Sequence, residues 1–163
     1  MTADQPQRKR GHKSSHPLSH AREIAMQSLY QLEIKAHKMD EVLRFGWLNQ
    51  DLEPAKRDYA RYLVQQVNQN RGALDVAIKV HARLHYSQMA VIVRTLLRLA
   101  IFELQTDEVP APILIDEYIE LTRKYDGEES VAFVNAVLDA WQREHVAAME
   151  GQSESNESDS ALS

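Results

Sequence analysis

Two histidines at a spacing of four residues, His81 and His85, are the first candidates for chemistry in this sequence. On a helix they would share one face and could hold a metal ion. The zinc-protease pattern also needs a general-base glutamate directly after the first histidine, and Ala82 occupies that position. The spacing therefore predicts two solvated or partly packed histidines and no metal site.

Adjacent carboxylates occur at Asp116-Glu117 and at Glu128-Glu129. Neighbours in a helix point to different faces, so neither pair predicts the acid/base dyad of a glycosidase. Both pairs lie in predicted first turns, where negative charge favours the helix dipole. The chain has 5 glycines, too far apart for a phosphate-binding loop, and no cysteine. We expect a protein that is not an enzyme and that has no cofactor.

The charge is distributed unevenly over the 163 residues, whose formal net charge is −5. Residues 1–22 carry five basic residues against one acid, whereas residues 150–163 carry four acids and no base. A basic head on an acidic body suits a polyanion that touches one end, and a solvated tail is the alternative interpretation. We expect a flexible basic arm over 1–18, a helical domain over 19–149 and a disordered acidic tail over 150–163.

Apolar residues recur at three- and four-residue steps along most of the chain, which predicts helices. Any functional site would therefore be positioned by helices. Nearly every face of residues 89–104 is apolar, which predicts a buried central helix. Pro110 and Pro112 suit the start of the next helix, which Asp126-Gly127 ends. No useful length alternates with strand periodicity. The pattern predicts an all-α fold of about seven helices in two packed bundles.

Four stretches of this chain, in order and in spacing, resemble the NusB family, and together they cover roughly residues 19–141. They are AREIAMQSLY at 21–30, LRLAIFEL at 97–104, a third made of VP at 109–110, IDE at 115–117 and IEL at 119–121, and FVNAVLD at 133–139. The resemblance implies two helical bundles sharing a core. It also implies a transcription antitermination factor that pairs with the ribosomal protein NusE and binds the boxA element of nascent RNA, notably in ribosomal RNA operons.

The partners that follow from the resemblance are single-stranded boxA-like RNA, NusE and the RNA polymerase antitermination complex. No apolar run approaches the length of a membrane span, so we expect a cytoplasmic protein without membrane association. The sequence is silent on oligomeric state and allows a homodimer.

RNA contact in that family uses an arginine-rich start to the first helix, and only Arg22 matches that run here. The other basic residues lie further upstream, where a mobile arm could neutralise phosphates. They are Arg8, Lys9, Arg10 and Lys13. Sequence-specific contact with single-stranded RNA also needs stacking, for which Tyr125 and Phe133 are the candidates by position. Arg123 would extend the basic edge beside Tyr125.

Each of these positions has a structural alternative. Phe133 is equally well interpreted as a core residue of the last helix. Arg123 also suits the end of a helix, where cations are favoured anyway.

Tyr30 is the candidate for the protein partner, on the exposed side of the first helix; a partly buried core tyrosine is the alternative. Val93 stands where the family usually has an acidic residue. This difference predicts a weaker or rearranged partner contact at that point.

Two other functions fit the same resemblance. One is a NusB-like RNA-binding subunit or adaptor that works with a separate enzyme modifying ribosomal RNA. The other is a structural adaptor that does not contact RNA. Titration with RNA distinguishes the second from an antitermination factor.

Overall fold

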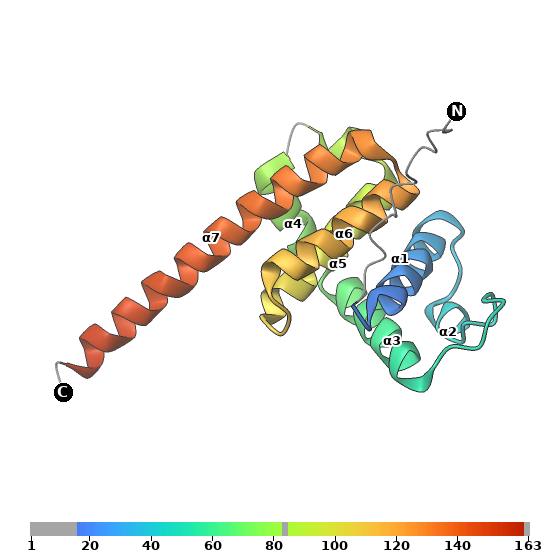
Figure 1. Ribbon diagram of the computed structural model, residues 1–163, viewed down its shortest axis with the longest axis horizontal. Helices are drawn as coiled ribbons and strands as arrows, with labels where there is room; N and C mark the ends of the chain where they lie inside the picture. The colour runs from blue at the N-terminus through green and yellow to red at the C-terminus, as the bar shows by residue number, and fades with distance from the viewer. Residues whose placement is uncertain (1–15, 83–84, 162–163) are drawn as a thin grey trace, which may run out of the picture.

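The computed structural model describes residues 16–82 and 85–161, and Figure 1 shows the course of the chain. Within these residues the regular elements are all helical, which confirms the predicted all-α fold. They are α1 (Ser19–Ile34), α2 (Met39–Val42), α3 (Pro54–Gln69), α4 (Arg71–Ala82), the 3-10 turn η1 (Tyr86–Gln88), α5 (Val91–Thr106), α6 (Ala111–Tyr125) and α7 (Glu128–Ser160).

Helix α5 is the centre of the molecule and packs against α1, α3, α4, α6 and α7. Its buried face includes Leu96, Leu97, Leu99 and Ile101, each fully covered. Helices α1, α2 and α3 lie on one side of α5 and α4 and α7 on the other, with α6 alongside it (Figure 1). The prediction of a buried central helix over 89–104 is confirmed, because a helix that is apolar all round needs neighbours on every side.

Helix boundaries follow the residues that the sequence suggested. Pro54 occupies the first turn of α3, where its missing N–H costs no hydrogen bond. Pro110 precedes α6 in an extended conformation, and the carbonyl of Pro110 accepts the first amide hydrogen bonds of that helix. Gly127 joins α6 to α7 with φ +97°, a conformation that favours glycine. The junction therefore depends on the Asp126-Gly127 pair.

The carboxyl-terminal residues, for which the composition predicts a disordered acidic tail, lie in the continuation of α7. Helix α7 continues to Ser160 with every side chain from 150 to 160 exposed. The serines share one local interaction, in which Oγ donates to the carbonyl four residues earlier. Ser153, Ser155 and Ser158 bond in this way to Met149, Gly151 and Glu154. This part of the helix contributes no buried residue to the core, since all of its side chains are exposed.

No helix in the described part of the chain combines the length and the apolar character that crossing a bilayer requires.

Candidate functional site

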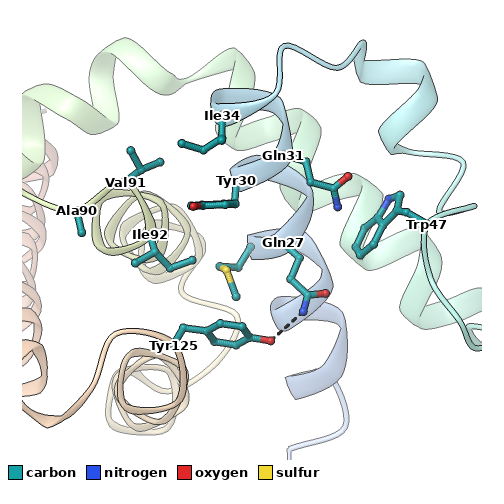
Figure 2. Close-up of a pocket in the computed structure, with 10 residues that line it drawn as sticks. Gln27, Tyr30, Gln31, Ile34, Trp47, Ala90, Val91, Ile92 and Tyr125 are labelled. Atoms are coloured by element: carbon teal, nitrogen blue, oxygen red, sulfur yellow. Dashed lines mark hydrogen bonds between the residues drawn. The ribbon is translucent and has the colours of Figure 1, made fainter.

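An apolar groove of about 540 Å³ runs between α1 and the start of α5. Figure 2 shows Tyr30 and Ile34 of α1 facing Val91 and Ile92 of α5 across it. Tyr30 is 37% exposed and Ile34 50%. The groove exists because α1 presents these large side chains on the face next to α5, and no other part of the described chain covers them. Its lining is completed by Met26, Gln27, Gln31, Trp47, Ala90 and Tyr125.

Trp47 forms one wall of the groove from the loop between α2 and α3. Helix α2 ends at Val42, and the chain turns at Phe45, whose φ of +55° is uncommon for a bulky residue. Trp47 Nε1 donates a hydrogen bond of 3.0 Å to the Val42 carbonyl, and its ring meets Phe45 edge-on. The signal available in the sequence was a cluster of apolar and aromatic residues around Trp47, which includes Phe45 and Leu48.

A second, polar pocket of about 430 Å³ lies on the other side of Trp47. It shares Trp47 and Gln27 with the apolar groove. The remaining lining comes from α1, the loop before α3 and the end of α6, namely His20, Glu23, Leu48, Asn49, Gln50, Asp51, Leu52 and Lys124. The two hollows therefore form one surface that crosses three parts of the chain.

Tyr125 joins α6 to α1 between these hollows. Its hydroxyl donates to the Glu23 carboxylate and accepts a 2.8 Å hydrogen bond from Gln27 Nε2 (Figure 2 draws the second). Burial, together with the hydrogen bond to the Glu23 carboxylate and its charge, raises the pKa of Tyr125 to about 12. Lys124 Nζ lies 2.5 Å from Glu23 Oε1 and 5.5 Å from the Tyr125 ring centroid. Tyr125 is thus a neutral hydrogen-bonding ring with a cation beside it.

The pKa of Glu23 is lowered from its ordinary value. Burial acts in the opposite direction, but the hydrogen bonds from Lys124 and Tyr125 and the positive charge of Lys124 outweigh it. Glu23 is therefore an anion that is held in place at neutral pH.

Arg123 follows on the exposed side of α6 and is 40% exposed. Its guanidinium pairs with Glu120 and with Glu128, the latter at 2.7 Å. These carboxylates compensate the charge of Arg123 but leave it accessible to solvent. The structure therefore brings Arg123, Lys124 and Tyr125 together at the end of α6, as expected from their order in the sequence.

Phe133 lies apart from this group, in a cleft of about 390 Å³ between α7 and the chain before α5. Its ring is partly buried and meets the His85 ring edge-on at 6.0 Å. Val93 lines the same cleft and is 3% exposed. Both interpretations of Phe133 keep support, since it packs against the core and still reaches a surface hollow.

Arg22, the one match to the family's arginine run, is buried, and its expected RNA contact is corrected by the structure. It has no exposed surface, and its Nε lies 2.8 Å from Glu103 Oε2. A second carboxylate, Glu117, lies 3.6 Å from its Nη1. Burial lowers the pKa of Arg22, but the Glu103 hydrogen bond and charge outweigh it and raise the pKa. A guanidinium used in this way braces α1 against α5 and α6 and cannot reach a phosphate.

The Glu103 carboxylate also accepts hydrogen bonds from the hydroxyls of two tyrosines, Tyr59 and Tyr118. Burial and the negative charge of Glu103 raise the pKa of each tyrosine. Four helices, α1, α3, α5 and α6, therefore meet at one buried polar cluster. Sequence periodicity could not reveal it, because each residue comes from a different segment.

The predicted arm residues Arg8, Lys9, Arg10 and Lys13 lie outside the described residues. The two histidines considered for a metal do not converge: His81 pairs with Glu144 at 3.2 Å, whereas His85 meets Phe133. No group of three or more metal-ligating side chains occurs within 16–82 and 85–161.

Known proteins are similar to this chain in sequence and in fold. The NusB family model matches residues 19–143. Relatives called Transcription antitermination protein NusB include one from Anaeromyxobacter dehalogenans, 45% identical over 73% of this chain and 85% of its own length. Another, from Leptospira biflexa, is 34% identical over 79% of this chain and 94% of its own.

Solved structures agree in fold. T. maritima NusB superposes with a TM-score of 0.70 at 26% identity, covering 79% of this chain and 92% of that one. A crystal structure of antitermination factors NusB and NusE in complex with double-stranded RNA gives 0.65 at 23% identity, over 77% and 95%.

Proposed function

This chain belongs to the NusB family, and from that premise we propose that it acts with NusE on boxA-like nascent RNA. In this proposal it is a transcription antitermination factor that supports transcription of ribosomal RNA operons as part of the RNA polymerase antitermination complex. It binds and positions macromolecules and has no catalytic role.

The observation that carries the proposal is the preformed apolar groove beside α1. An exposed apolar hollow of about 540 Å³, rimmed by the amides of Gln27 and Gln31, is typical of an interaction site. Tyr30 stands in it with its ring accessible. Tyrosine suits a protein interface because it offers a large apolar ring and a polar tip. We assign this groove to NusE.

RNA contact is assigned to the basic arm and to the end of α6. The arm residues Arg8, Lys9, Arg10 and Lys13 supply phosphate contacts, which give affinity with little sequence information. Arg123 adds a further exposed guanidinium. The partly buried ring of Tyr125, at the border of the groove, is the candidate for stacking on a base. Phe133 offers a second ring further along α7. A protein of the same fold has been crystallised with NusE and double-stranded RNA, which supports the choice of these two classes of partner.

The test is a titration of the full chain with a boxA-like single-stranded RNA, with and without purified NusE, across a salt series. Affinity should rise when NusE is present and fall as salt increases, since phosphate contacts release counterions. The mass of the complex, measured in the same experiment, shows the oligomeric state. A folded protein that binds neither RNA nor NusE would refute the proposal.

Reversing Arg8, Lys9, Arg10 and Lys13 to glutamate should weaken RNA binding by more than about tenfold at low salt and flatten its salt dependence. The control is an arm of the same composition in shuffled order. It should keep nearly full affinity, because phosphate contacts read charge rather than sequence. Unchanged affinity in the reversed variant would move the RNA contact onto the folded body.

A further inference from the structure

We propose that the polar pocket beyond Trp47 receives a lysine or arginine side chain of the protein partner, with Asp51 as its counter-ion. The inference rests on the proposed function, because it extends the partner segment in the apolar groove past Trp47. The apolar part anchors the segment, and the cation selects its direction along α1.

Continuity between the two hollows is the first support. Gln27 and Trp47 line both, so a chain lying in the apolar groove reaches the polar pocket by passing the indole edge. Figure 2 shows Gln27 and Gln31 of α1 on the side of the helix facing Trp47. Amide side chains at that position can bond to the backbone of an extended segment.

The contacts of the loop that carries Trp47 are the second support. Phe45 adopts a left-handed φ of +55°, which is uncommon for a bulky residue. Arg61 stabilises this loop in two ways. Its guanidinium donates a 3.3 Å hydrogen bond to the Leu43 carbonyl and lies 5.9 Å from the Phe45 ring centroid. With its Nε1 bonded to Val42, the indole is positioned before any partner arrives.

Charge decides which partner the pocket fits. Glu23 is already neutralised by Lys124 at 2.5 Å, and it also accepts from Tyr125. Asp51 is exposed and makes no ion pair with any residue in the described part of the chain. The carboxylates of Glu23 and Asp51 and the ammonium of Lys124 together leave one negative charge at the pocket, which repels phosphate and attracts a cation. The pocket therefore favours a basic protein segment over RNA.

The experiment measures the affinity of purified NusE for the full chain and for two variants at Asp51. Asp51→Asn keeps the shape and removes the charge, and it should weaken binding about threefold at low salt. Asp51→Lys places like charges together and should weaken binding about tenfold. Both effects should shrink in high salt, since exposed charges are screened. Asp139→Asn, which removes an exposed carboxylate of α7 outside both hollows, is the matched control and should bind as the wild type does.

Trp47 is tested by Trp47→Ala, which should weaken NusE binding about tenfold, and by Trp47→Phe, which should restore most of it. Thermal unfolding of each variant separates a lost contact from a lost loop, and the Asp51 variants keep the test independent of folding.

The outcomes are distinct. If wild-type protein does not bind NusE, the proposed function fails and this inference falls with it. If wild type binds and Asp51→Lys binds equally well, only the inference is overturned. If Asp51→Lys strengthens RNA binding and leaves NusE affinity unchanged, the pocket faces RNA, and the inference is again overturned.

Discussion

Arg22 and Arg123 each pair with two carboxylates, yet Arg22 lies in the interior and Arg123 lies on the surface. Arg22 pairs with Glu103 and Glu117 and has no exposed area. Arg123 pairs with Glu120 and Glu128 and is 40% exposed. The comparison shows that residue type and partner type do not reveal whether a charge is available to a ligand; burial does.

The physical difference is the cost of desolvation. A buried arginine must keep its partners, because a charge without them in a low-dielectric interior costs several kcal/mol. An exposed arginine is hydrated and screened, so a phosphate oxygen can replace a carboxylate at little cost. The cluster around Arg22 therefore holds four helices together, whereas Arg123 stays free to exchange partners.

The largest expected effect is on the buried side of the comparison. Glu103→Gln removes the anion that Arg22, Tyr59 and Tyr118 share, and should lower the free energy of unfolding by about 3 kcal/mol. Urea denaturation monitored by circular dichroism measures it. The matched control, Glu120→Gln on α6, removes an exposed partner of Arg123 and should change stability by less than about 0.5 kcal/mol. Equal losses in the two variants would contradict the distinction.

An intermediate effect is expected on RNA affinity at the exposed side. Arg123→Ala should weaken binding of boxA-like RNA about threefold at low salt, by removing one phosphate contact. Glu128→Gln should strengthen binding, since it releases Arg123 from one competing carboxylate. Both are measured by fluorescence anisotropy, with Arg143→Ala, an exposed arginine of α7, as the control. Weaker binding in Glu128→Gln would show that the pair orients Arg123 instead of competing with RNA.

The smallest expected effect is a pH dependence at Glu23, which lies between the two extremes with 20% of its side chain exposed. Because its folded pKa is depressed, its contribution to stability is present above the ordinary pKa of about 4.3 and is lost as pH falls through the folded pKa. Solvent screening keeps this contribution below about 1 kcal/mol.

The pH dependence is measured by comparing urea midpoints of wild type and Glu23→Gln from pH 7 down to about pH 3, since the unfolded carboxyl titrates near 4.3. The difference between them should narrow as the medium becomes acidic. A difference that stays constant over this range would show that the Glu23 carboxylate contributes through its shape and not its charge.

Much of the fold was predictable because its signals are local. The all-round apolar character of α5, the prolines at the start of α6, and Asp126-Gly127 each act over a few residues. The continuation of α7 beyond residue 150 was not predicted, because an acidic, serine-rich composition is typical of disorder.

Prediction of the candidate site was mixed for the same reason. The grouping of Arg123 with Tyr125 follows from their adjacency, and Tyr30 is accessible on α1 as its helical position suggested. Trp47 and Asp51 were not predicted as site residues. Their place in the site depends on a loop that folds back onto α1, and no periodicity in the sequence indicates such a loop.

The chain alone was enough to predict the helices, the buried centre and the resemblance to the NusB family, since these follow from patterns along the sequence. The fate of each charge was set by three-dimensional packing. Arg22 became a brace because Glu103 and Glu117 approach it from α5 and α6 in the interior. Asp51 remained exposed and unpaired within the described residues because its loop ends at the surface. Desolvation depends on neighbours distant in sequence, and only the assembled helices bring those neighbours together.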